Sequence, residues 1–438
     1  MPAENMTFRE YSSHKVLNYM TRLVNAPAAY RAAFFVLVAS YLNAVLSVVA
    51  VFIAGIWLIT DKRRIKRILS DSINLIAFIF IGMTVIVAVV NRNWVGFAAS
   101  LFFACLMIIM MNLRAVINRR LFEDLITCHL CYSVFSTLIA IIQKLFHLND
   151  PLFRSDATFL NPLYYSYFIA LGAVMCTYRL VVSPRAKAAH LTVLLINIVG
   201  MFCSGGRMPW MGMFIGCLAV LILCRRYKLL VLFLAAIAAL VAFAALFPDI
   251  KMLSALRLGS LDDGYNERIP YWHRALDGFF ESPIAGKGFL GVLNGSIGEN
   301  ADLFRRFFET FDLNAFFADM KSRGWMLHAH NFLFDMLCNF GIVGSALLAF
   351  CIIRYLSKMY RRFEYRSSQP MIALMVGFIC AVGVNSVLDC QYIGLQTSVF
   401  TMIFFSATGL KKEKAYDDSR SELTMSDIRN FLHKHKQR

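Results

Sequence analysis

Two histidines stand directly before a long apolar stretch, in the string His328-Ala329-His330-Asn331. Polar side chains at the mouth of a membrane helix are costly to place there and are often functional. The positive dipole end at a helix N-terminus disfavours an imidazolium, so we expect His330 to be neutral and able to accept a proton. The string predicts a general base at His330, with His328 and Asn331 lining the substrate site. Interfacial anchoring and a His-x-His metal site are the alternatives, and no further cluster of metal ligands lies nearby in the sequence.

Arg207 ends a short polar string, Ser204-Gly205-Gly206-Arg207, between two apolar stretches. An arginine on the outer side of a membrane protein opposes the usual excess of basic residues inside, so Arg207 calls for an anionic partner. The Ser204 hydroxyl and the backbone N–H groups of the glycines are expected to help it hold a phosphate. An arginine that only reaches the lipid headgroups is the alternative.

Two further arginines lie beside aromatic residues: the group consists of Arg268, Tyr271, Trp272 and Arg274. The planar guanidinium makes paired hydrogen bonds and therefore suits a diphosphate. The aromatic rings can stack on a sugar. We expect this group to bind a substrate that carries both a diphosphate and sugars.

The acidic residues are weaker candidates for a metal site or for catalysis. Asp262 and Asp263 adjoin a glycine, a pattern more typical of a solvated turn than of a metal site, since one acidic pair makes a poor site. Asp389, at the outer end of a predicted span, can orient a base or an acceptor, or cap a helix. No metal ion and no cofactor are expected.

The composition predicts that a membrane holds these residues. Of 438 residues, 59% are hydrophobic and 16% charged, and the mean hydropathy is +0.60, far more apolar than a soluble domain. The net charge of +17 comes from short basic runs between apolar stretches, which indicates membrane topology and not a nucleic-acid surface. No removable signal peptide is evident at the N-terminus.

Ten apolar stretches are long enough to cross a hydrocarbon core about 30 Å thick. They span residues 73–90, 94–113, 121–146, 162–181, 189–203, 208–224, 229–247, 329–356, 370–388 and 393–410. Basic clusters occur at every second connection, which assigns those connections to the cytoplasm. Residues 28–60 then form a hairpin of two short spans that turns near 40–43, so that about twelve spans are expected, with both ends inside.

This topology predicts five parts of the chain. They are a cytoplasmic segment 1–27, about nine transmembrane helices over 28–247, a large outer loop 248–328, three transmembrane helices over 329–410, and a cytoplasmic tail 411–438. The loop is rich in aromatic residues and is expected to fold as a partly helical lid. Residues 302–320 have the pattern of an amphipathic helix, either interfacial or packed within the loop.

The second half of the chain resembles the O-antigen ligase and O-antigen polymerase superfamily of bacterial envelope transferases. The resemblance rests on the string that begins at His330, the string that ends at Arg207, and Arg268-x-x-x-Trp272, with glycines at 286, 288, 341 and 344. Many relatives carry serine where this chain has Gly206, which leaves the hydroxyl contribution to Ser204. The first half matches only in hydropathy.

The resemblance implies an all-α integral membrane protein of GT-C-like type, an inverting and metal-independent glycosyltransferase. His330 would deprotonate the acceptor hydroxyl, while Arg207 and Arg268 would stabilise the leaving diphosphate. The donor would be an undecaprenyl-diphosphate-linked glycan and the acceptor lipid A core oligosaccharide, at the periplasmic face of the bacterial inner membrane.

Polymerases of this superfamily tend to have two sizeable outer loops with matched arginine motifs, whereas only one large outer loop is predicted here. The resemblance therefore favours a ligase over a polymerase that uses a second lipid-linked glycan as acceptor. A lipid-linked sugar transporter is the alternative from another class. The spans show few midplane charges and no evident repeat, which argues against transport.

Overall fold

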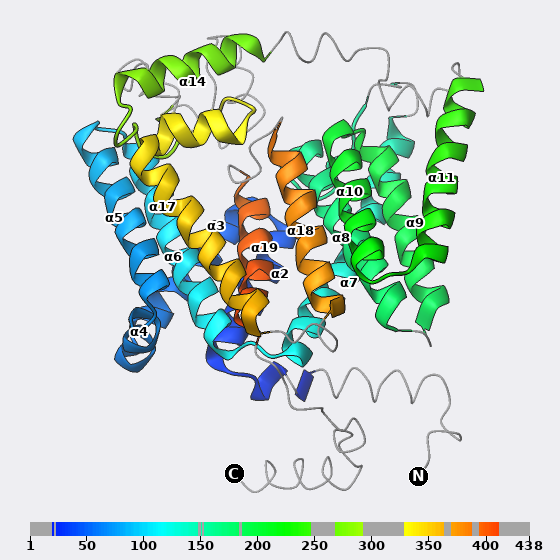
Figure 1. The fold of residues 1–438 in the computed structure, drawn as a ribbon, viewed down its shortest axis with the longest axis horizontal. Helices are drawn as coiled ribbons and strands as arrows, with labels where there is room; N and C mark the ends of the chain where they lie inside the picture. The colour runs from blue at the N-terminus through cyan, green and yellow to red at the C-terminus, as the bar shows by residue number, and fades with distance from the viewer. Residues whose placement is uncertain are drawn as a thin grey trace, which may run out of the picture.

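The computed structural model of the protein is built from helices and has no strand within the residues that it describes. Those residues are 20–21, 23–147, 150, 153–183, 186–246, 268–291, 328–362, 369–387 and 394–410. Most of the helices run side by side in a bundle, with α14 lying across one end and α4 at the opposite end (Figure 1). We refer to these as the α14 end and the α4 end.

The first helices form the predicted hairpin. Helix α2 (Ala28–Leu42) and helix α3 (Ala44–Ile59) meet at Asn43, whose side chain accepts a hydrogen bond from the N–H of Val45 at 2.7 Å. The basic run that follows, expected as a connection, is instead the helix α4 (Lys62–Leu69), bent by 92° from α3. Its apolar face packs on the bundle and its cations point outward, as in a helix that lies along a surface.

The remaining helices lie where spans were predicted. They are α5 (Ser72–Val90), α6 (Trp94–Val116), α7 (Arg119–Phe146), α8 (Pro162–Val182), α9 (Lys187–Ser204), α10 (Arg207–Leu223), α11 (Tyr227–Leu246), α17 (Phe332–Arg362), α18 (Gln369–Val387) and α19 (Leu395–Phe405), with the 3-10 helix η6 (Ser406–Gly409) after α19. Helix α14 (Ile269–Glu281) belongs to the predicted outer loop.

Seven helices of the described part are long and apolar enough to cross a membrane, or eight if α3 and α4 count as one bent span. The protein is therefore a multi-pass membrane protein, and the total of about twelve spans stays a prediction. Helix α8 is the central one, since 83% of its most apolar window is buried inside the bundle.

Helices α10 and α18 pack against each other in opposite directions through small residues. A Cβ atom at Gly212 would lie 2.3 Å from the amide nitrogen of Asn385, and one at Gly216 would lie 2.8 Å from the carbonyl oxygen of Gly377. Glycines allow this close approach of two membrane helices. The first turn of α10 and the last turn of α18 consequently share the α14 end.

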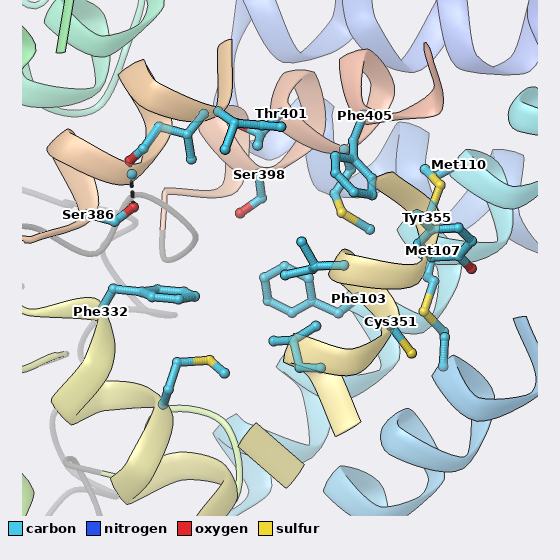
Figure 2. Close-up of a pocket in the computed structure, with 18 of the residues that line it drawn as sticks. Phe103, Met107, Met110, Phe332, Cys351, Tyr355, Ser386, Ser398, Thr401 and Phe405 are labelled. Atoms are coloured by element: carbon cyan, nitrogen blue, oxygen red, sulfur yellow. Dashed lines mark hydrogen bonds between the residues drawn. The ribbon is translucent and has the colours of Figure 1, made fainter. Parts of the chain in front are cut away.

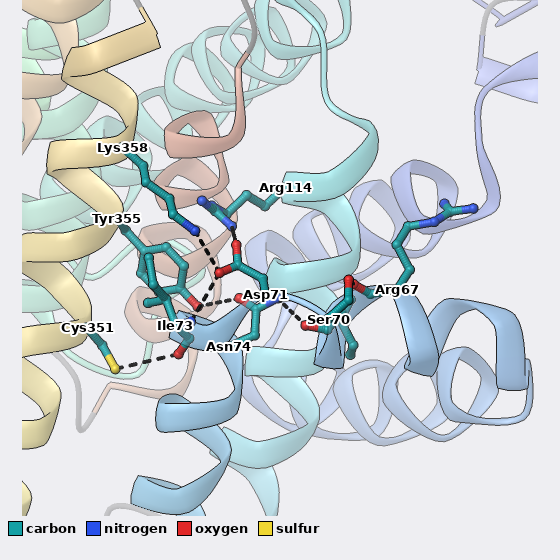
Figure 3. Close-up of polar contacts among 10 residues, drawn as sticks. Arg67, Ser70, Asp71, Ile73, Asn74, Arg114, Cys351, Tyr355 and Lys358 are labelled. Atoms are coloured by element: carbon teal, nitrogen blue, oxygen red, sulfur yellow. Dashed lines mark hydrogen bonds and ion pairs between the residues drawn. The ribbon is translucent and has the colours of Figure 1, made fainter.

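At the α4 end, Asp71 joins three helices (Figure 3). Its carboxylate caps α5 and accepts hydrogen bonds from Arg114 of α6 at 3.2 Å and from Lys358 of α17 at 2.7 Å. Burial alone would raise the pKa of this carboxyl, but the bonds from Lys358, the Ile73 N–H and Arg114 outweigh it and hold the pKa below its ordinary value. The basic clusters that end α6 and α17 were predicted to share one side of the membrane, and they share one end of the bundle.

Helix α17 differs from its predicted form. The predicted span 329–356 is a helix that starts at Phe332 and is broken at Gly341, where φ is +59° and ψ is −168°. Almost only glycine adopts this conformation. The break divides α17 into a short segment beside α14 and a longer one that continues to the α4 end (Figure 1).

Candidate active site

Asn331 fixes the start of α17. Its side-chain oxygen accepts hydrogen bonds from the N–H groups of Leu333 at 3.0 Å and Phe334 at 3.2 Å, the usual arrangement of a helix N-cap. Its amide nitrogen donates to the carbonyl oxygen of Val387, in the last turn of α18, at 3.0 Å. Asn331 thus joins the beginning of α17 to the end of α18.

A buried carboxylate holds the turn that carries the predicted base. Asp335, one turn into α17 and fully buried, accepts a hydrogen bond from the Ala329 N–H at 2.7 Å. Within the turn, the N–H of His330 donates to Nδ1 of His328 at 3.1 Å, and the two ring centroids are 4.1 Å apart. His330 has φ of +51°, which is uncommon for a residue with a side chain. A left-handed conformation held by a buried carboxylate is the kind of local strain found at functional sites.

Helix α14 brings an aromatic wall to this turn. The ring of Tyr271 stacks on the ring of His330, with centroids 5.6 Å apart and an angle of 29° between the planes. Trp272 packs on Phe334 of α17, at 5.8 Å between centroids, and on a small core that includes Ala329. The predicted aromatic residues therefore lie next to the predicted base, although they are far from it in sequence.

The two arginines of this group lie on α14 itself. Arg268 is the residue before its first turn, and its carbonyl oxygen accepts from the N–H groups of Tyr271 at 3.0 Å and Trp272 at 3.1 Å. Residues three apart on a helix are neighbours on its surface, so Tyr271 lies between Arg268 and Arg274 on α14. Both arginines are half-buried.

The glycine-rich segment 282–291 docks into the break of α17. The N–H groups of Ile342 and Val343 donate to the carbonyl oxygens of residues 283 and 284, at 2.8 and 3.1 Å. In return, the carbonyl oxygens of Cys338 and Asn339 accept from the N–H groups of residues 287 and 288, at 2.9 and 2.8 Å. In an unbroken helix these four groups would bond to each other, so the segment replaces one turn of α17.

This docking explains the glycines of the motif. Gly286 has φ of +70°, and a Cβ atom there would lie 2.4 Å from the backbone N of Phe340. A Cβ atom at Gly341 would lie 2.4 Å from the carbonyl oxygen of Ile284. The two backbones touch at these positions, and the glycines hold α14 in place above the start of α17.

The string that ends at Arg207 forms the junction between α9 and α10. Gly205, with φ of +62°, ends α9, and the half-buried Arg207 begins α10. The Ser204 hydroxyl is fully buried and donates to the carbonyl oxygen of Met201 at 2.8 Å, so in this structure its proton points into α9. A contribution of Ser204 to phosphate binding stays a prediction.

A serine on another helix accounts for Gly206. A Cβ atom at position 206 would lie 2.4 Å from the hydroxyl oxygen of Ser166, which donates to the carbonyl of Pro162 in α8. The place that a serine at 206 would need is thus already taken by a serine hydroxyl from α8.

Two functional candidates escaped the sequence prediction. Arg154 donates from Nε to the carbonyl oxygen of Ser204 at 2.8 Å, and the neighbouring Ser155 N–H donates to the carbonyl of Cys203 at 3.0 Å. The signal for Arg154 in the sequence was a basic residue in a connection otherwise poor in basic residues, the same signal that singled out Arg207. The second candidate is Asp335, and its signal was an acidic residue inside a predicted span.

The elements bring the predicted residues to one end of the bundle. Asn331 contacts the end of α18, and α18 packs along α10, whose first residue is Arg207. Helix α14 carries Tyr271, whose ring stacks on His330 and whose N–H donates to the carbonyl oxygen of Arg268. Three features lie outside the described residues: Asp389, the Asp262-Asp263 pair and the amphipathic pattern 302–320. Within the described ranges, no three His, Cys, Asp or Glu side chains come together as metal ligands.

Residues 192–349 match the family model described as O-antigen ligase. The matched region begins in α9 and ends in α17, and it contains Arg207, α14, the docked segment and His330. The match supports the predicted resemblance of this part of the chain to the O-antigen ligase and polymerase superfamily. It also supports the predicted class of enzyme, a glycosyltransferase-type enzyme for lipid-linked sugars. No curated protein matches the chain.

Proposed function

We propose that this protein is an O-antigen ligase. It transfers a glycan from undecaprenyl diphosphate to a sugar hydroxyl of lipid A core oligosaccharide, with inversion and without a metal ion. The observation that carries the proposal is the placement of His330 just before α17. It stacks on Tyr271, and its left-handed turn is held by the hydrogen bond that the Ala329 N–H donates to Asp335. A rigidly placed imidazole at the end of the bundle that also carries Arg207 and Arg268 suits base-assisted displacement of a diphosphate.

The reaction is a single displacement at the anomeric carbon of the donor. His330 accepts the proton of the acceptor hydroxyl while the hydroxyl oxygen attacks the anomeric carbon. The bond from the anomeric carbon to the diphosphate oxygen breaks at the same time. General base catalysis of this kind contributes about 10² to 10⁴-fold to the rate. Arg207 and Arg268 hold the diphosphate and stabilise the charge that develops as it leaves.

The remaining candidates bind and position the substrates. His328 and Asn331 keep His330 in place, Tyr271 and Trp272 offer faces for sugar rings, and Arg274 and Ser204 extend the anion site. The α14 end faces the periplasm of a bacterial inner membrane. Support comes from the basic residues at the α4 end, because cytoplasmic connections carry the excess of Lys and Arg.

The choice between ligase and polymerase is tested by the acceptor. Purified protein is supplied with the lipid-linked donor alone, or with donor and lipid A core oligosaccharide. A ligase forms the lipid A conjugate when both substrates are present. It does not extend the donor when the donor is supplied without lipid A core. Chain growth on the donor without any lipid A core would show a polymerase, and unchanged substrates in both reactions would refute glycan transfer.

A further inference from the structure

An apolar cavity of about 640 Å³ lies inside the bundle, between α5 and α6 on one side and α17, α18 and α19 on the other. Its wall runs from Asn331 and Val387 at the α14 end to Met110 and Tyr355 near the α4 end. In Figure 2, Phe332 and Ser386 lie on one side of this space, while Met107 and Tyr355 lie across from them. The cavity therefore extends lengthwise along α17.

The polar groups in the wall are engaged with the protein. Ser386 donates to the carbonyl oxygen of Val382 at 2.8 Å, and the hydroxyls of Tyr167 and Thr401 are hydrogen-bonded to each other at 3.1 Å. The rest of the wall is almost entirely hydrocarbon, phenyl and thioether groups. A ligand with a polar body would lose its hydration there and gain few hydrogen bonds, so the wall suits a hydrocarbon ligand.

The two ends of the cavity differ. At the α14 end the wall includes Asn331, the residue after His330, and the exposed side chains of Leu333 and Val387. At the other end the buried Tyr355 closes the space. Its hydroxyl donates to Asn74 at 2.6 Å, and the guanidinium of Arg114 lies 4.4 Å from its ring centroid (Figure 3).

Behind Tyr355 lies the charged cluster of Asp71, Arg114 and Lys358. Hydrocarbon is not stable in contact with unshielded charges, so this layer is a floor that an apolar chain does not pass. A hydrocarbon chain that enters from the side of the candidate active site therefore stops at this layer, and its polar end stays at the mouth next to Asn331.

We propose that this cavity binds the polyprenyl chain of the donor, tail inward, and thereby places the diphosphate at His330, Arg207 and Arg268. The identity of the chain rests on the proposed function. The cavity itself selects a long hydrocarbon whose polar group ends at Asn331. The Tyr355 floor limits how much of the chain is held inside the protein, and the rest lies in the bilayer.

Two pairs of variants test the proposal. Gly383 of α18 lines the cavity, and a Cβ atom there meets nothing within 4 Å, so Gly383→Phe fills the space without a clash with its neighbours. Gly82 of α5 is equally open but lies outside the lining, and Gly82→Phe is the matched control. From α17, Ile352→Trp fills the cavity, and Ile353→Trp, at the next residue and outside the lining, is its control.

The readout is retention of undecaprenyl phosphate by the purified, folded protein, measured by native mass spectrometry in competition with phosphatidylethanolamine. We expect both cavity-filling variants to reduce retention of undecaprenyl phosphate at least tenfold and both controls to leave it unchanged. If a cavity-filling variant does not fold, the other pair decides. Equal retention by filled and control variants would overturn the proposal, as would equal occupancy by phosphatidylethanolamine. A wild-type protein that binds undecaprenyl phosphate in this way but transfers no glycan would refute the proposed function and leave this site standing.

Discussion

Asp335 should decide whether the turn at His330 is ready for catalysis. Its carboxylate bonds to the N–H of Ala329, and both residues are fully buried. In Asp335→Ala that N–H loses its acceptor, which costs about 1–3 kcal/mol for a buried group. The left-handed conformation of His330 itself costs on the order of 1–3 kcal/mol and persists only while its surroundings hold it. The two magnitudes are similar, so removal of the carboxylate is enough to let the turn relax.

The consequence is a displaced base in a folded protein. A shift of about 1 Å at a reacting group lowers a rate about 10²-fold, so we expect Asp335→Ala to lower kcat for conjugate formation by that order with little change in KM. Asp335→Asn keeps an acceptor oxygen, with a bond about half as strong, and should restore most of the activity.

The assay measures kcat and KM of purified variants with donor and lipid A core, with circular dichroism as the check on folding. In a His330→Ala background, Asp335→Ala should add almost nothing, because the two residues act as one unit. Additive losses in the double variant, or an Asn variant as inactive as the Ala variant, would refute the positioning role of Asp335.

Three further predictions concern the frame around the site. Gly341→Ala should lower the melting temperature and weaken protease resistance of the docked segment, since its backbone conformation costs about 1–3 kcal/mol for other residues and its Cβ meets a carbonyl, whereas Gly82→Ala should be neutral. The lowered pKa of Asp71 means that its ion pairs stabilise the fold above pH ~4 and that this stability is lost as the pH falls through the lowered pKa. Asp71→Asn should therefore melt earlier at neutral pH and show a flatter acid dependence in a thermal melt. Gly206→Ser should reduce activity through the clash with Ser166, and the double variant with Ser166→Ala should recover it in the conjugation assay.

The helical framework could be predicted from the sequence because each span carries its own signal. The turn at Asn43 and the common end shared by Arg114 and Lys358 follow from local hydrophobicity and charge. The α4 helix was missed for a related reason. A short basic run between spans carries a topology signal that hides its helical apolar stripe, formed by residues such as Ile68.

The break in α17 and the role of Asp335 could not be predicted in this way. An apolar window averages over one glycine and one acid, and the groups released at Gly341 are satisfied by a segment about fifty residues earlier in the chain. The motif residues were identified by type, and their partners were not. That Tyr271 stacks on His330 depends on long-range packing of α14, for which the sequence has no local signal.

The most direct test of the account is the rate of conjugate formation by His330→Ala in the presence of a metal chelator. His273→Ala is the matched control, an exposed histidine on α14 two residues from Tyr271. The account predicts that wild type and His273→Ala form the lipid A conjugate with chelator present, while His330→Ala is folded and slower by about 10² to 10⁴-fold. Full activity of the folded His330→Ala protein would contradict it.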